Sequence, residues 1–113
     1  MLFLLDSSVP GALESWLRGL GHDAISAAAA STPDAILAMA AKEQRILLTS
    51  DQALLDPERV AAGVVYLNLP GGRESELTER LEELLKRDPP CIGPGWAVFV
   101  ERGHDRIFKI PAK

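Results

Sequence analysis

Three aspartates stand at positions where the ends of predicted elements would bring them together. Asp6 follows an apolar run at residues 1–5, Asp51 follows a second run at 46–48, and Asp34 opens a predicted helix. Parallel strands end at one edge of a sheet, and a crossover helix that begins near this edge can add a third carboxylate. Carboxylates that lie within a few ångströms of one another repel unless a cation neutralises them. Such oxygen ligands suit Mg²⁺ or Mn²⁺, which can activate a water and stabilise charge on a phosphate.

Each aspartate also has a simpler interpretation. Asp6 and Asp51 can accept hydrogen bonds from the backbone at the start of the next helix. Asp34, in a first helical turn, can offset the positive end of the helix dipole. Only the joint pattern of the three residues favours a metal site.

Apolar runs bounded by turn signals predict strands that alternate with helices. The expected strands are 1–5, 24–26, 46–48, 64–67, 96–100 and 106–110, the last two forming a closing antiparallel pair. This alternation implies right-handed crossovers and a mostly parallel sheet with helices on both faces. The predicted fold class is therefore α/β, with a C-terminal antiparallel hairpin.

Helix signals fall between the predicted strands. Ser7 or Ser8 is expected to cap the first helix, with Pro10 in its first turn. A second helix should start at residues 31–33, and a brief helical turn is expected at 51–55. The clearest helix is 74–87, where leucines form one stripe and opposite charges recur four residues apart on the other face.

Composition indicates one globular domain over residues 1–113. The chain is 47% hydrophobic and 25% charged, and its only cysteine, Cys91, cannot form an internal disulfide. These features, with no visible export signal or membrane-spanning run, fit a cytoplasmic protein. The net charge of −4 argues against strong nucleic-acid binding through the overall field, but leaves a transient RNA substrate possible.

Four segments carry a family resemblance: FLLD at 3–6, LGHD at 20–23, PDAIL at 33–37 and ILLTSD at 46–51. They resemble the motifs of short bacterial PIN-like proteins, which are related to the PIN-domain toxins of toxin–antitoxin pairs. The resemblance implies a PIN-like three-layer sandwich and an endoribonuclease that depends on Mg²⁺ or Mn²⁺.

The resemblance also implies roles for individual residues and for partners. Asp6, Asp34 and Asp51 match the acidic residues expected to hold metal, and Thr49 matches the polar residue that lines the site. An RNA substrate, an antitoxin protein and homodimerisation follow in the same way, with Trp96 and the terminal hairpin as candidate dimer contacts.

The chain departs from the family pattern at two places. Ser7-Ser8 stands where Glu-Asn is common after the first aspartate, and Ala53 stands where another aspartate is common. These differences leave open a catalytically degenerate PIN-like module that binds a partner protein or RNA. A phosphoacceptor receiver domain is disfavoured, because no second acidic residue adjoins Asp6 and no lysine ends the last parallel strand.

Overall fold

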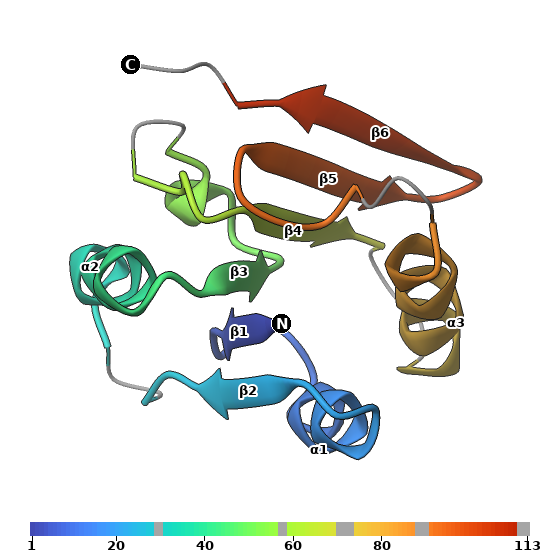
Figure 1. Ribbon diagram of the computed structural model, residues 1–113, viewed down its shortest axis with the longest axis horizontal. Coiled ribbons are helices and arrows are strands. Elements are labelled where there is room, and N and C mark those ends of the chain that lie inside the picture. The colour runs from blue at the N-terminus through green and yellow to red at the C-terminus, as the bar shows by residue number, and fades with distance from the viewer. Residues whose placement is uncertain (29–30, 57–58, 70–73, 88–90, 111–113) are drawn as a thin grey trace.

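The computed structural model describes residues 1–28, 31–56, 59–69, 74–87 and 91–110, which build one six-stranded sheet with three α-helices (Figure 1). The strand order is β2-β1-β3-β4-β5-β6, and every neighbouring pair is parallel except β5 and β6. In chain order the elements are β1 (Leu2–Leu5), α1 (Ala12–Gly19), β2 (Asp23–Ser26), α2 (Pro33–Glu43), β3 (Ile46–Thr49), the 3₁₀ helix η1 (Gln52–Leu54), β4 (Val64–Asn68), α3 (Glu74–Leu85), β5 (Trp96–Glu101) and β6 (His104–Lys109).

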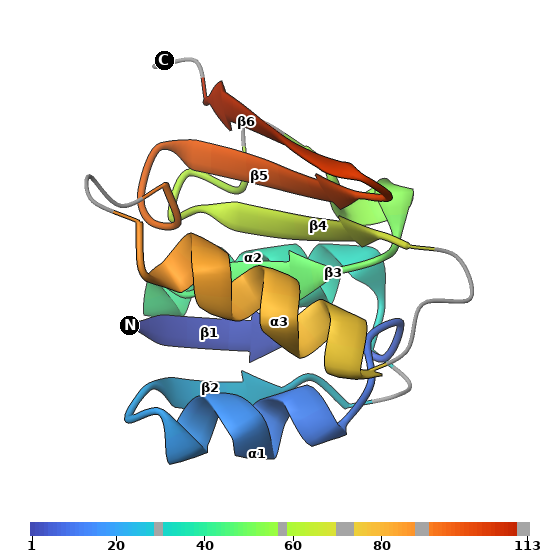
Figure 2. The ribbon, with the colours of Figure 1, turned by 90° about the vertical axis from the view of Figure 1, so that its right-hand side faces the viewer.

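The elements form three layers, with α1 and α3 on one face of the sheet and α2 on the other (Figure 2). Alternate residues of each strand point to opposite faces. Phe3 and Leu5 pack with α1 and α3, whereas Leu4 and Leu47 pack with α2 and η1. The predicted α/β fold, its mostly parallel sheet and its C-terminal hairpin are confirmed.

The topology places a reversal of strand order at β1. From β1 the chain crosses to β2 on one side, and from β2 it crosses back to β3 on the other side. The connections after β1 and β3 therefore lead to opposite faces, which opens a crevice at their carboxyl ends. Ligands of open α/β sheets bind in such a crevice.

The start of α1 differs from the prediction. Gly11 occupies the N-cap position without a side-chain hydrogen bond, because the Ser8 hydroxyl is engaged by Asp6 instead. Leu13, Leu17 and Leu20 follow one another at helical spacing in the sequence, but only Leu13 and Leu17 are buried, because Leu20 lies beyond the helix and is 49% exposed.

The other helices follow their sequence signals with small differences. Thr32 caps α2 by accepting a hydrogen bond from the Ala35 N–H at 3.1 Å, as the signal at 31–33 predicts. Glu82 of α3 forms an ion pair at 2.7 Å with Lys86, directly after the helix, at the expected spacing of four residues. Arg80 does not pair with Glu76, four residues before it, but with Asp105 of β6, because the partly buried Asp105 carboxylate is a better partner than the exposed Glu76.

Arg45 ties the amino ends of three strands together. Its guanidinium donates to the Phe3 carbonyl at 3.2 Å and to the Asp23 carboxylate at 2.9 Å, next to the start of β3. The hydrogen bond to Glu43 raises the pKa of Arg45, and the contact with Asp23 adds to this rise. The charge-assisted bonds fix β3 and β2 on either side of β1.

A close backbone approach joins the loops that precede β4 and β5. Gly63 has φ +114°, and a Cβ at this position would lie 2.5 Å from the Gly93 carbonyl oxygen. The Gly95 N–H donates to the Ala61 carbonyl at 2.9 Å beside it. Only glycine fits here, because both the conformation and the space exclude a side chain.

Cys91 should be an unreactive thiol in the folded protein. Burial raises its pKa, and the nearby positive charge of Arg87 opposes this rise only in part. We expect alkylation at pH 8 to be at least about tenfold slower in the native protein than in urea, because the thiolate is the reactive form. Equal rates with and without urea, followed by mass spectrometry, would contradict this burial.

Within the described residues, no helix combines the length and the apolar character that a bilayer crossing requires.

Candidate active site

The candidate active site begins with Asp6 and Thr49 at the carboxyl ends of β1 and β3. Leu5 pairs with Leu48 in the parallel register, so Asp6 lies opposite Thr49, the last residue of β3. Asp6 is 6% exposed and Thr49 is fully buried. Their neighbours Leu4 and Leu47 belong to the same buried cluster under α2, so both polar side chains lie on that face of the sheet.

Ser8 links the two strand ends. Its hydroxyl donates to Asp6 Oδ1 at 2.6 Å and accepts from the Ser50 N–H at 2.8 Å. The Thr49 hydroxyl oxygen lies 3.3 Å from the Ser8 hydroxyl oxygen. This network holds the Asp6 carboxylate in one orientation against the end of β3, because each added hydrogen bond removes a freedom of the side chain.

Asp51 stands at the entrance to the next turn. Its N–H donates to Thr49 Oγ1 at 3.0 Å, and its carboxylate accepts from the Ala53 N–H at 2.9 Å, which caps η1. The simpler interpretation of Asp51 as a cap is therefore confirmed. A carboxylate has several acceptor sites, so the cap leaves Asp51 able to bind a further donor or cation.

Asp34 sits in the first turn of α2, where its side chain is 87% exposed. Arg59 donates to the Asp34 carboxylate at 2.6 Å and to the Asp34 carbonyl at 3.2 Å. An exposed ion pair of this kind contributes about 0–1 kcal/mol. Asp34 is thus paired with Arg59, from the loop before β4, in an ion pair that contributes little to stability.

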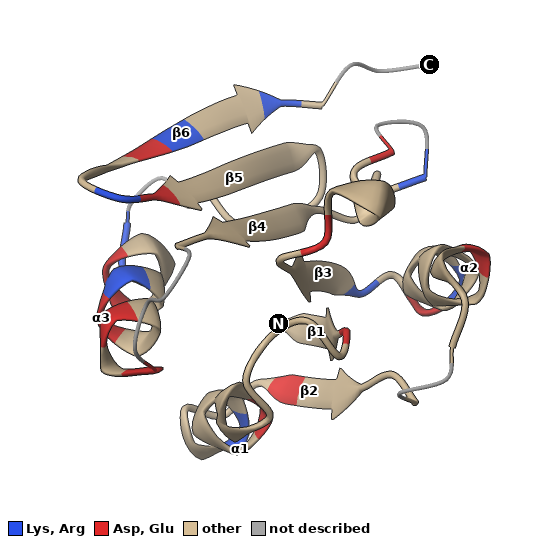
Figure 3. Cartoon of the chain, turned by 180° about the vertical axis from the view of Figure 1, so that it is seen from behind, with Lys and Arg blue, Asp and Glu red and all other residues tan. Residues whose placement is uncertain are grey.

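The structure unites some of the predicted residues and not others. Asp6, Thr49 and Asp51 are connected through the hydrogen bonds of Ser8 and Thr49, whereas Asp34 is engaged by Arg59. Over the described ranges, no three His, Cys, Asp or Glu side chains lie close enough together to hold a metal ion. Figure 3 shows acidic residues directly after β1 and β3, at the edge that the topology favours.

Sequence reasoning missed Ser8 as a site residue. The prediction assigned Ser7 or Ser8 to the cap of α1, which is wrong. The only signal for its actual role is its place two residues after Asp6, from where a short hydroxyl side chain can reach back to the carboxylate.

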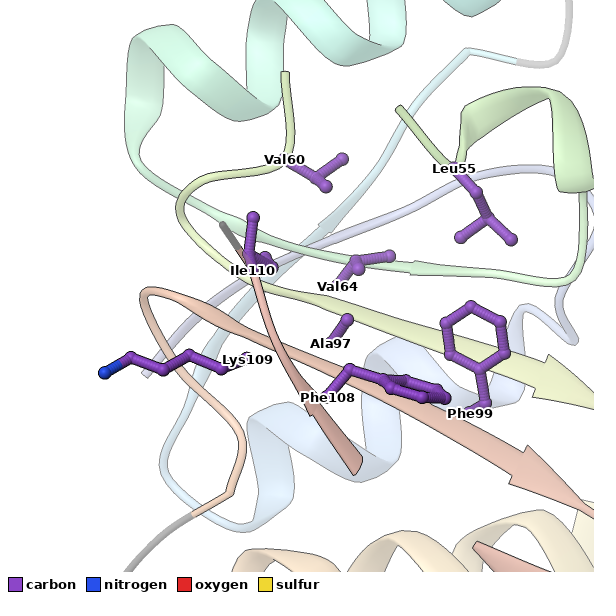
Figure 4. A pocket seen from close by; sticks show the side chains of 8 residues that line it. All are labelled: Leu55, Val60, Val64, Ala97, Phe99, Phe108, Lys109 and Ile110. Atoms are coloured by element: carbon purple, nitrogen blue, oxygen red, sulfur yellow. The ribbon is translucent and has the colours of Figure 1, made fainter. Parts of the chain in front are cut away.

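An apolar pocket lies on the same face of the sheet but over β4, β5 and β6 (Figure 4). Its volume is about 300 Å³, and its lining includes Leu55, Val60, Phe99, Phe108 and Ile110. None of its lining residues is acidic, so this pocket is not where a carboxylate-dependent reaction takes place.

Comparison with known proteins assigns the family. The model of the Mut7-C RNAse domain matches residues 1–89, which include β1 through α3 and the network around Asp6. No curated protein and no solved structure gave a match. The matched family is of the PIN-like, RNase type, so the predicted resemblance is confirmed at this level, and its description indicates a ribonuclease-like function. The match spans most of the length of the chain, so the chain belongs to the Mut7-C RNAse domain family.

Proposed function

We propose that the protein is an endoribonuclease that depends on Mg²⁺ or Mn²⁺ and cleaves RNA at the carboxyl edge of β1 and β3. The observation that carries the proposal is the Asp6, Ser8 and Thr49 network at the reversal of strand order, in a chain of a ribonuclease family. Asp6 and Thr49 are buried polar residues, and burial of such groups favours a specific role for them.

The residues fit a metal site with one or two carboxylate ligands better than a site with three or more. Mg²⁺ usually binds one or two carboxylates and keeps several waters. Asp6 and Asp51, which flank the end of β3, meet this requirement. Asp34 would join them only after leaving Arg59, which costs little for an exposed pair. When bound, the ion would activate a water and offset charge on the phosphate.

The other residues prepare the site. Ser8 orients the Asp6 carboxylate and, through the Ser50 N–H, holds the loop after β3. Thr49 orients the backbone of Asp51. The chain has a net charge of −4, so RNA approaches this edge against an unfavourable overall field unless cations neutralise the carboxylates.

The direct test is cleavage of a single-stranded RNA with Mg²⁺ or Mn²⁺, with and without a chelator. The proposal expects cleavage that the chelator abolishes, and loss of cleavage when Asp6→Asn and Asp51→Asn are combined. Cleavage that survives both substitutions contradicts the assigned site.

Removing Arg59 tests whether Asp34 is a metal ligand. In Arg59→Ala, the Asp34 carboxylate loses its cation, so we expect Mn²⁺ to bind about two- to fivefold more tightly in calorimetry. Lys42→Ala is the matched control, because it removes a cation from the opposite end of α2. An equal response of the two variants would remove Asp34 from the metal set.

A catalytically degenerate PIN-like module that binds a partner protein or RNA is the second candidate. It is favoured by the lack of a three-ligand cluster among the described residues and by Ala53 in place of an acidic residue. Specific Mn²⁺ binding that Asp51→Asn abolishes speaks for the enzyme and against this module. A toxin-type role with an antitoxin partner stays a prediction of the resemblance.

A further inference from the structure

Strand β6 forms an outer edge of the sheet, and no other strand of the described residues pairs with its free side (Figure 1). The Ile110 N–H donates to the Gly95 carbonyl at 2.8 Å, so it points toward β5. Backbone groups alternate along an antiparallel strand, which directs those of Asp105, Ile107 and Lys109 away from β5. The free side of β6 thus presents donors and acceptors to a further strand.

The side chains of β6 alternate between the two faces. Asp105 points to the face covered by α3, where Arg80 contacts it, and Lys109 lies four residues further on the same face. Arg106 and Phe108 occupy the opposite face. The Arg106 guanidinium lies 5.6 Å from the centre of the Phe108 ring, and Phe108 is 44% exposed.

We propose that two copies of the chain pair through β6, antiparallel to each other, about a two-fold axis at Ile107. The outward backbone groups of Ile107 then meet those of Ile107 of the second copy, and the sheets join into one. In this register Asp105 lies opposite Lys109 of the second copy, and the reverse pair forms by symmetry. Arg106 lies opposite Phe108 of the second copy, which adds a cation–π contact across the axis.

The charges select both the occupant and the register. Sheet edges are commonly protected by charged residues that repel another strand. Strand β6 itself carries both acidic and basic segments (Figure 3), so in the proposed register residues of opposite charge face each other. An axis at Asp105 or Lys109 would oppose identical charges, and an axis at Arg106 would oppose two guanidinium groups. An axis at Phe108 would place Lys109 opposite Ile107 of the second copy, without an ion pair.

Sedimentation of the full chain from about 1 to about 200 µM tests the proposal. We expect a monomer–dimer equilibrium in this range. Lys109→Glu places like charges at two symmetric positions, so its dimer dissociation constant should rise by about tenfold or more. Lys109 is exposed, so the variant should keep the wild-type melting temperature at the lowest concentration, where the dimer contributes least to stability. A wild-type chain that is monomeric throughout overturns the proposal.

Lys86→Glu is the matched control, because it makes the same charge change at an exposed residue directly after α3. It should leave the dissociation constant unchanged. An equal weakening by Lys86→Glu, or no weakening by Lys109→Glu, overturns the axis at Ile107. The dimer does not depend on the proposed ribonuclease activity, so each idea can fail without the other.

Discussion

Asp6→Asn should lower the rate of RNA cleavage by about a hundredfold or more. The amide has the size of the carboxylate and its oxygen can still accept the Ser8 hydroxyl, so the network and the fold should persist. What the substitution removes is the negative charge at the end of β1. The effect therefore reports on the need for an anionic group at this position rather than on packing.

Asp23→Asn provides the control for this experiment. Asp23 is also an aspartate beside the end of a strand, but it contacts Arg45 at the amino edge of the sheet. We expect cleavage by this variant to match the wild type, with Mg²⁺ and Mn²⁺ alike. Similar losses in both variants would show that general charge, and not the carboxyl edge of β1 and β3, governs the reaction.

Gly63→Ala should destabilise the fold by about 3 kcal/mol or more. The new Cβ would have to occupy space 2.5 Å from the Gly93 carbonyl oxygen and 3.0 Å from its carbon. Both atoms are backbone, so relief requires movement of the loop before β5. Because the Leu47 N–H donates to the Gly63 carbonyl at 3.0 Å, the strain also reaches β3.

Gly21→Ala separates the two causes of the stability loss in Gly63→Ala, which are the steric clash of the new Cβ and the strain of a positive φ. Gly21 has φ +93°, and nothing lies within 4 Å of the position of its missing Cβ. This variant carries only the backbone strain, about 1–2 kcal/mol. Urea unfolding of both variants measures the difference. Equal losses of stability would mean that the loops before β4 and β5 separate easily, against the close approach described above.

The sequence predicts most of the fold because the core has simple periodicity. Uninterrupted apolar runs such as 46–48 arise when a strand is buried on both faces, and the structure buries Ile46, Leu47 and Leu48. The prediction that a serine caps α1 was wrong. A serine shortly before a helix indicates a cap, whichever group its hydroxyl contacts in the folded chain. Local rules do not report a competing acceptor such as Asp6.

The candidate site was predictable only where strand ends define it. Asp6 and Thr49 are neighbours because the register of β1 and β3 makes them so. The hydrogen bond from the Ser50 N–H to Ser8 and the ion pair of Arg59 with Asp34 join loops far apart in the chain. Their formation depends on loop paths, which neither periodicity nor residue type specifies.

The hairpin of β5 and β6 lies beyond the residues that the family model matches, yet the matched part relies on it. Val98 and Val100 of β5 are fully buried, and β5 pairs with β4 along the whole of that strand. A fragment that ends at residue 89 would lack β5, so β4 would become an apolar edge strand with one unpaired side, which is prone to aggregation. For this chain the smallest unit worth expressing therefore extends through residue 110, whatever the limits of the recognised motif.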